Sequence, residues 1–146
     1  MSVNIQIATK SDEVPRPEDI RRWAEHALDL CAEEMAMTVR VVGIEEGTEL
    51  NERWRKGTGP TNVLAFCIDD LEISPPLLGD VVICAPVVDM EAHRDGKVAN
   101  AHWAHLVIHG TLHLLGYNHV DPIDAEKMEQ LERELLHDLR YPDPYI

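Results

Sequence analysis

Three histidines stand close together in one short segment of this sequence. Residues 107–119 read VIHGTLHLLGYNH and place them in the pattern H-x-x-x-H-x-x-G-x-x-H. On a helix, side chains four residues apart lie one turn apart on the same face, so the imidazoles of His109 and His113 can bind one metal ion. Gly116 is suited to end that helix and let the chain reverse, which returns His119 toward the other two. Three protein ligands with one open position are typical of a catalytic zinc site, whereas a structural site fills all four positions.

The residue that follows His109 bears on which reaction such a site supports. The spacing resembles the zinc-protease signature H-E-x-x-H-x-x-G-x-x-H, in which the glutamate is the general base. In this sequence Gly110 stands in place of that glutamate. Without a carboxylate to accept the proton of the attacking water, peptide hydrolysis by that route is disfavoured. Histidines with unrelated roles explain the spacing poorly, so the segment predicts metal binding.

Two further histidines precede this segment on the same side of the expected helix. His102 and His105 share one helical stripe with His109 and His113. One interpretation is a solvated polar face opposite the apolar residues of the helix, and the other is a cleft that leads to the metal. His105 lies one turn before His109, so we expect it to contribute to substrate binding.

The spacing of apolar residues predicts the elements that must position these histidines. Strands are expected at residues 3–8, 38–44, 61–68 and 79–85. Helices are expected at residues 16–35, 47–55, 86–95, 99–115 and 121–139, with Thr48 opening the second and an exposed Pro-rich connection at 72–79. We expect residues 1–146 to form one α+β domain, in which a mixed four-stranded sheet is packed with helices. Its zincin-like metal-binding helix should contact the sheet through Trp103, Leu106, Val107 and Leu114.

The composition limits the class of protein. A chain of 146 residues that is 45% hydrophobic and 27% charged is typical of one soluble domain. It has neither an apolar run of the roughly 18 residues that a membrane helix needs nor a signal peptide, so we expect a cytoplasmic protein without membrane contact. Cys31, Cys67 and Cys84 are odd in number and widely spaced, so no disulfide-linked partner is expected.

The charge is strongly acidic but unevenly distributed. The formal net charge is −14, which argues against nucleic-acid contact over most of the surface. The segment NERWRKGTG nevertheless carries Arg53, Arg55 and Lys56 against Glu52 alone. Taken by itself, this segment is best explained as a helix, a turn and a strand with exposed arginines. It also permits a local basic site on an acidic body.

Four motifs together resemble those of a known family. They read LNERWR, PTNVLAF, LGDVVI and HGTLHLLGYNH, in this order between residues 50 and 119. The chain is similar in these motifs and in length to the YbeY family of metal-dependent endoribonucleases, which act in ribosomal RNA maturation. Three positions depart from the family pattern: Trp54 replaces a tyrosine, Ala65 a serine and Asn118 an aspartate. None of these departures affects an expected metal ligand, although Asn118 lacks the charge of the aspartate.

The resemblance implies one zinc ion per chain, bound by His109, His113 and His119, and an important arginine at Arg55. A guanidinium stays charged and presents a planar fork to phosphate oxygens, so Arg55 can hold the scissile phosphate and stabilise charge in the transition state. We assign Arg55 and His109 to catalysis, and Arg55, Lys56 and His105 to substrate binding.

The resemblance favours one function and leaves two alternatives. It implies a single-strand-specific, zinc-dependent endoribonuclease that processes the 3′ end of 16S ribosomal RNA and acts in ribosome maturation and quality control. Its partners would be ribosomal RNA and proteins of the small ribosomal subunit. The alternatives are another zincin-like hydrolase such as a peptidase, and a non-catalytic assembly factor whose metal stabilises the fold. Asp80 is expected to serve structure or a partner contact rather than the site.

Overall fold

The computed structural model describes residues 2–11, 13–70 and 75–146. The elements are, in chain order, β1 (Ser2–Ala8), α1 (Pro17–Leu28), β2 (Ala36–Val42), α2 (Ile44–Trp54), β3 (Val63–Asp70), β4 (Leu77–Cys84), α3 (Ala85–Arg94), α4 (Ala99–Leu114) and α5 (Pro122–Asp138). The expected α+β architecture with one mixed four-stranded sheet is confirmed.

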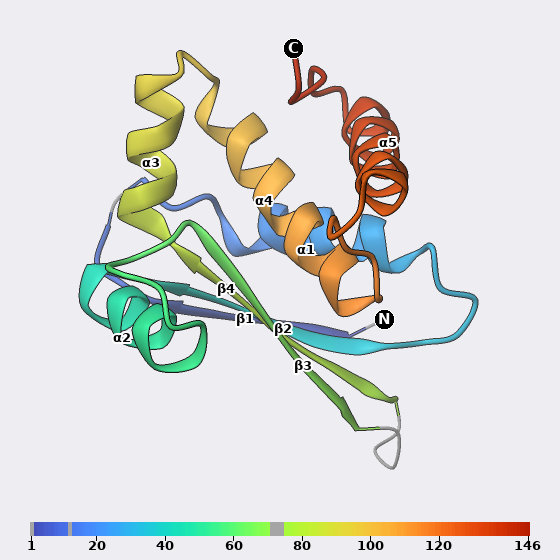
Figure 1. Cartoon of the computed structure of the whole chain (residues 1–146), viewed down its shortest axis with the longest axis horizontal. Helices are drawn as coiled ribbons and strands as arrows, with labels where there is room; N and C mark the ends of the chain where they lie inside the picture. Colours follow the sequence, from blue (N-terminus) through green and yellow to red (C-terminus); the bar gives the residue numbers. More distant parts are fainter. Residues whose placement is uncertain (1, 12, 71–74) are drawn as a thin grey trace.

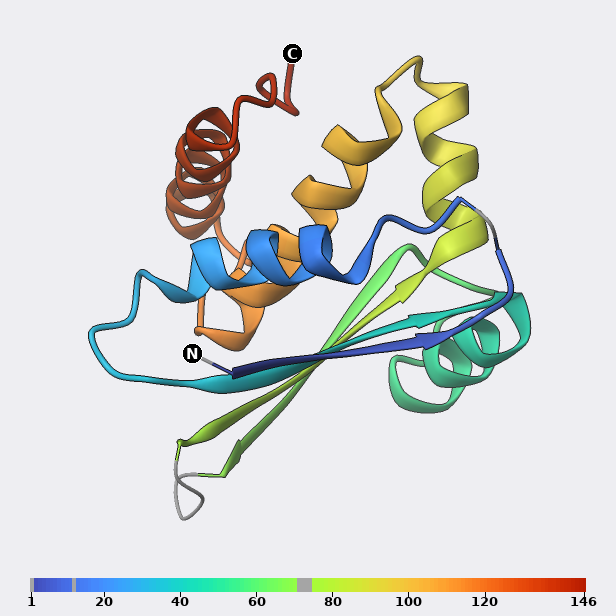
Figure 2. The same ribbon diagram turned by 180° about the vertical axis from the view of Figure 1, so that it is seen from behind.

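The sheet has the strand order β1-β2-β4-β3. The first three of these strands are parallel, and β3 runs antiparallel to β4 at the edge of the sheet. A parallel pair of strands needs a crossover, which α1 provides between β1 and β2. Helices α1 and α4 lie over one face of the sheet and α2 lies over the other, as Figure 1 shows and Figure 2 shows from behind.

The main core lies between the sheet and α4. The four residues predicted to pack this helix on the sheet are all buried: Trp103, Leu106, Val107 and Leu114. Helix α4 packs tightly against the sheet at Gly110, where an added Cβ would lie 2.6 Å from a methyl carbon of Val81 and 3.3 Å from one of Val63. A hydrogen in place of a side chain at Gly110 therefore lets the histidine helix lie directly against β4 and β3.

A smaller core lies on the opposite face of the sheet. It consists of Val42, Leu64, Val82 and Cys84, with Leu50 of α2 and Phe66 of β3 packed against it. Successive strand residues point to opposite faces, so Val81 contributes to the α4 side and Val82 to the α2 side. The sheet therefore separates two surfaces, and the edge strand β3 has residues on both.

Several element boundaries differ from the sequence-based expectations. The first helix ends at Leu28, well before residue 35, because the chain needs residues 29–35 to return to the start of β2. Helix α2 begins at Ile44 with Gly43 as its N-cap, so the expectation that Thr48 opens it was wrong. Strand β4 begins at Leu77, and residues 72–74 of the expected Pro-rich connection lie outside the described residues. In the described part of the chain, no helix is long and apolar enough to cross a membrane.

Candidate metal centre

Helix α4 presents two of the three predicted ligands on adjacent turns. The Nε2 atoms of His109 and His113 lie 3.1 Å apart, and their ring centroids are 4.6 Å apart. Both side chains are partly exposed, whereas their neighbours Ile108 and Leu112 are fully buried against the sheet. The burial of one face of α4 therefore holds the two imidazoles on the open face.

The turn after α4 brings back the third histidine. Gly116 has a φ of 101°, a conformation that glycine adopts without strain, and the backbone N–H of Tyr117 donates to the Leu112 carbonyl to close the helix end. The ring centroid of His119 then lies 5.6 Å from that of His109 and 5.1 Å from that of His113. One nitrogen of each of the three rings lies within 4.8 Å of the others.

A buried carboxylate on α5 orients the first of these histidines. Glu132 has no exposed surface, and the Nδ1 atom of His109 donates to its Oε1 at 2.5 Å. With its proton on Nδ1, the ring directs the Nε2 lone pair toward His113 and His119. Metal-binding histidines ordinarily have such a carboxylate partner on the other nitrogen. Three imidazole nitrogens with one carboxylate behind them fit a zinc-like ion that keeps an open position.

The pKa of His113 also suits a ligand. Burial, together with the neighbouring charges of His109 and His119, lowers this pKa from 6.5 to about 4. The ring is therefore neutral at physiological pH, and its lone pair is available to a metal without the loss of a proton.

Glu132 was missed as a site residue in the sequence, where it is one of many acids near the C-terminus. Besides His109, the Nε2 atom of His105 donates to Glu132 at 3.0 Å, and the hydroxyl of Tyr145 donates to the same carboxylate. Burial works to raise the pKa of Glu132, but the hydrogen bonds from the two histidines outweigh it and lower the pKa to about 2. The sequence feature that could have identified Glu132 is its position in the apolar stripe of α5, four residues after Met128 and three before Leu135.

His105, His109 and Glu132 also form a group of potential metal ligands. Their contacts of 3.0 and 2.5 Å have the lengths of hydrogen bonds. Because Glu132 accepts the Nδ1 proton of His109, the Nε2 lone pair of the same ring remains for an ion beside His113 and His119. These residues are therefore a hydrogen-bonded support of the metal centre rather than a second centre.

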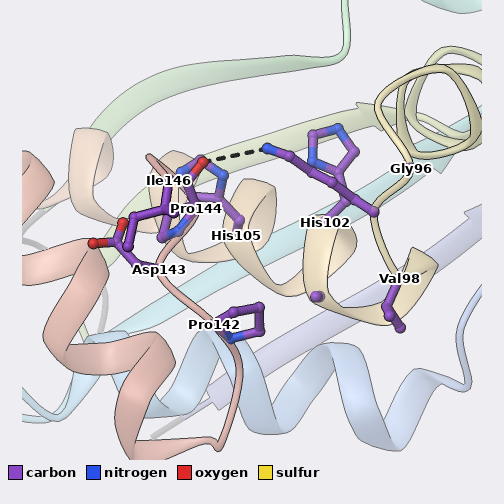
Figure 3. Close-up of a pocket in the computed structure, with 10 residues that line it drawn as sticks. Gly96, Val98, His102, His105, Pro142, Asp143, Pro144 and Ile146 are labelled. Atoms are coloured by element: carbon purple, nitrogen blue, oxygen red, sulfur yellow. Dashed lines mark hydrogen bonds between the residues drawn. The ribbon is translucent and has the colours of Figure 1, made fainter.

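The histidine stripe does not continue into the pocket of the three ligands. His102 is buried and its Nε2 atom donates to Glu91 at 3.0 Å, so the interpretation as a solvated face does not hold for it. His102 and His105 line a separate pocket of about 310 Å³ between the start of α4 and residues 142–146 (Figure 3). The Nζ atom of Lys97 donates to the Pro144 carbonyl across this pocket. The assignment of His105 to substrate binding thus concerns a neighbouring pocket.

Arg55 lies in the same pocket as the three histidines. This pocket of about 350 Å³ is lined by Arg55, by residues of β3, by His109 and His113 of α4, and by His119 of the following turn. The guanidinium donates through Nη2 to the Ala65 carbonyl at 2.6 Å, which leaves its other N–H groups for a ligand. Among the described residues Arg55 has no carboxylate partner, whereas Arg53 lies 4.0 Å from Glu49.

Lys56 and Asn51 lie on either side of Arg55 in the chain and have different environments. Lys56 is exposed, has a positive φ of 54°, and does not line this pocket. Asn51, which the sequence analysis did not assign, is buried and donates through Nδ2 to the Gly59 carbonyl at 2.8 Å. It fixes the loop that carries Arg55, so the motif LNERWR combines a positioning amide with the arginine. Asp80 lies on the α2 side of the sheet, away from the histidines.

Comparison with known proteins agrees with this geometry. The family model described as endoribonuclease YbeY matches residues 4–140. A protein named endoribonuclease YbeY from Stutzerimonas stutzeri is 53% identical, with 90% of this chain and 83% of that protein covered. A second, from Pseudomonas syringae pv. tomato, is 50% identical, with 99% and 88% covered.

A solved structure is similar in fold. The solution structure of TM1509 from Thermotoga maritima superposes with a TM-score of 0.61 at 24% identity, over 93% of this chain and 91% of that one. At this level of identity the likeness concerns the fold alone. The family match over nearly the whole sequence and the relatives at about half identity establish that this chain belongs to the endoribonuclease YbeY family.

Proposed function

We propose that this protein is a zinc-dependent endoribonuclease that cleaves single-stranded RNA, and that residues 1–146 form one metallohydrolase domain. The observation that carries the proposal is the shared pocket of Arg55 and three imidazoles that converge on one point. When bound there, zinc would act as a Lewis acid, which polarises a phosphoryl oxygen or lowers the pKa of a bound water toward 7.

Different residues would bind the metal and the phosphate. His109, His113 and His119 would hold one zinc ion per chain, with Glu132 fixing the proton of His109 on Nδ1. Arg55 would bind the scissile phosphate through the guanidinium N–H groups that Ala65 leaves unused, and would stabilise the negative charge that builds up during cleavage. Lys56 and His105 would contact the RNA outside this pocket.

The proposed substrate is ribosomal RNA. The family name and the basic residues around Arg55 support RNA as the substrate. The proposed site of action is the 3′ end of 16S ribosomal RNA during maturation and quality control. Because a body with a net charge of −14 offers few contacts to naked RNA, we propose that proteins of the small ribosomal subunit supply part of the specificity. This role requires a cytoplasmic protein.

Both alternative functions are less well supported. A peptidase of the related signature needs a glutamate after its first histidine, and here even a Cβ at Gly110 would lie 2.6 Å from Val81. A non-catalytic factor would need the metal only for stability. That function gives no role to Arg55, which has no carboxylate partner among the described residues and lies beside three solvent-accessible histidines.

The test of this function is a comparison of Arg55 variants. Metal-loaded protein should cleave single-stranded RNA and not casein, and a chelator should stop the cleavage. Arg55→Glu should abolish cleavage while metal content and folding stay unchanged, because it introduces repulsion where the phosphate binds. Arg55→Lys keeps the charge without the bidentate fork and should restore activity only in part. Arg53→Ala is the matched control and should retain most activity; wild-type cleavage by Arg55→Glu would refute the assignment.

A further inference from the structure

Trp54 is exposed in a protein that buries its other tryptophans. It is 60% exposed, whereas Trp23 and Trp103 are 0% exposed. It ends helix α2 directly before Arg55, and the guanidinium of Arg53 lies 5.3 Å from its ring centroid. An exposed indole between two arginines has the composition of a stacking platform for bases of single-stranded nucleic acid.

Trp54 forms one wall of a shallow pocket on the α2 side of the sheet. The pocket has a volume of about 370 Å³, and its apolar surface comes from Leu50, Trp54, Phe66 and Val82. Its charged residues are Arg40, Glu46 and Asp80. A flat apolar wall with a few polar groups at its border suits a planar, partly polar ring.

Asp80 is the charged residue of this pocket that lacks a partner. Arg40 and Glu46 satisfy each other through contacts of 2.6 and 2.9 Å. In the part of the chain that the structure describes, the Asp80 carboxyl group has no hydrogen bond or ion pair, and partial burial raises its pKa. A partly exposed carboxylate without a donor from the protein is free to accept the N–H groups of a ligand.

Arg55 lies between this pocket and the metal pocket, which are on opposite faces of the sheet. The guanidinium donates to the Ala65 carbonyl, and its Cζ atom lies 6.0 Å from the ring centroid of Phe66. Ala65 lines the pocket of the three histidines, and Phe66 lines the pocket of Trp54. Because β3 is the edge strand of the sheet, an RNA chain can pass around this edge at Arg55 and reach both pockets.

We propose that the Trp54 pocket binds the base next to the phosphate at Arg55, with the base stacked on the indole and its Watson–Crick edge donating to Asp80. Guanine fits best, because its N1–H and N2–H groups are adjacent and both donate to one carboxylate. Uracil offers one such donor and should be disfavoured. This inference rests on the proposed RNA substrate, and it adds a preference for guanosine beside the cleaved bond.

The preference can be measured without cleavage. Guanosine and inosine 5′-monophosphates share the phosphate and the ring, but inosine lacks the N2 amino group. Calorimetric titration should give about fivefold tighter binding of the guanosine nucleotide, because one added hydrogen bond typically increases affinity by about this factor. Both nucleotides should quench the fluorescence of Trp54, and the quenching should vanish in Trp54→Phe because the remaining indoles are buried.

Two variants separate the contributions of the carboxylate and the ring. Asp80→Asn keeps the size of the side chain and should make the two affinities equal. Trp54→Ala should weaken both nucleotides by about fivefold or more, because stacking serves either base. Equal affinities already in the wild-type protein, or no response of Trp54 fluorescence, would overturn the proposal. It would also be overturned if Asp80→Asn left the preference intact and instead abolished binding of a basic protein of the small ribosomal subunit.

The RNA reaction then distinguishes this inference from the proposed function. Two otherwise identical single-stranded RNAs, with guanosine or inosine beside one bond, should be cleaved at different rates at that bond. If neither RNA is cleaved while the nucleotides are still discriminated, the proposed function fails and the base pocket stands. If both are cleaved equally and the nucleotides bind equally, the base pocket fails alone.

Discussion

At the scale of single residues, the metal centre depends on the orientation of imidazole rings. An imidazole has two nitrogens, and only a partner on one of them decides which lone pair faces the metal. Glu132 does this for His109 from a fully buried position, and Tyr145 donates to the same carboxylate. The proposed ligands and their supporting carboxylate thus come from α4, the following turn and α5.

Replacement of a ligand should remove the metal. Wild-type protein should bind about one zinc-like ion per chain. His113→Ala should bind little, because the two remaining histidine ligands hold zinc only weakly. Elemental analysis after dialysis measures this directly. His93, which is exposed on α3, provides the control, and His93→Ala should retain full occupancy. Full metal content in His113→Ala would rule out the ligand assignment.

Replacement of the supporting carboxylate should weaken the metal centre while the ligands remain. Glu132→Gln keeps the size of the side chain but offers His109 and His105 only one amide oxygen. Loss of a carboxylate partner typically reduces metal affinity by about 10- to 100-fold. Competition with a chelator of known affinity measures the change. Tyr145→Phe, which removes one donor and leaves the carboxylate, should have a smaller effect; unchanged affinity in Glu132→Gln would contradict the support role.

At the scale of elements, the position of α4 against the sheet places the histidines. One face of this helix is buried, and the absence of a side chain at Gly110 allows a close approach to Val81 and Val63. Valine is stiff about χ1, so its methyl groups cannot easily rotate away from a new neighbour.

Gly110→Ala should therefore destabilise the fold. The added methyl would lie 2.6 Å from Val81 and would push α4 outward, with an expected loss of about 1–3 kcal/mol in the free energy of unfolding. Urea denaturation measures this loss. Gly43→Ala is the control, because its methyl would lie 3.6 Å from the Thr9 hydroxyl at a φ of −90°, which alanine tolerates. Equal stability of the two variants would show that α4 is less tightly packed than described.

At the scale of the whole molecule, the net charge limits where RNA can bind, and protonation affects the stability of the metal-free protein. The net charge of −14 confines nucleic-acid contact to a local region. Arg55, which has no carboxylate partner in the described part of the chain, contacts the edge strand β3 through the Ala65 carbonyl. The site residues with strongly shifted pKa values lie in and around the metal centre, so the stability of the metal-free protein should depend on them.

Metal-free protein should lose stability as the pH falls. His113 has a pKa of 6.5 when unfolded and about 4 when folded, so the unfolded chain binds more protons between these values and acid favours unfolding. The pKa of Glu132 falls from 4.5 to about 2, which extends the same trend to lower pH. Urea midpoints in the presence of a chelator should decrease from pH 7 to pH 4. His113→Ala should flatten the upper part of this decrease; a midpoint that rises with acid would contradict both pKa directions.

Much of this protein follows from its sequence because the responsible interactions are local. The spacing of His109 and His113, together with Gly116, depends on helix geometry and on one backbone conformation. The sequence also predicted the four strands, for example from the apolar alternation at residues 3–8 and from the uninterrupted apolar run at residues 79–85. Element ends were less accurate, and Thr48 was wrongly taken as the start of α2, because a helix start depends on where the preceding strand leaves the sheet.

The tertiary structure alone decided how distant segments combine. Glu132 lies 23 residues from His109 along the chain, and only the packing of α5 on α4 turns one acid among many into the partner of a proposed metal ligand. The order of strands places β3 at the edge, which lets Arg55 reach the histidine pocket while Trp54 and Asp80 lie on the other face. Such contacts depend on side-chain packing between elements far apart in the chain, which periodicity along one segment does not encode.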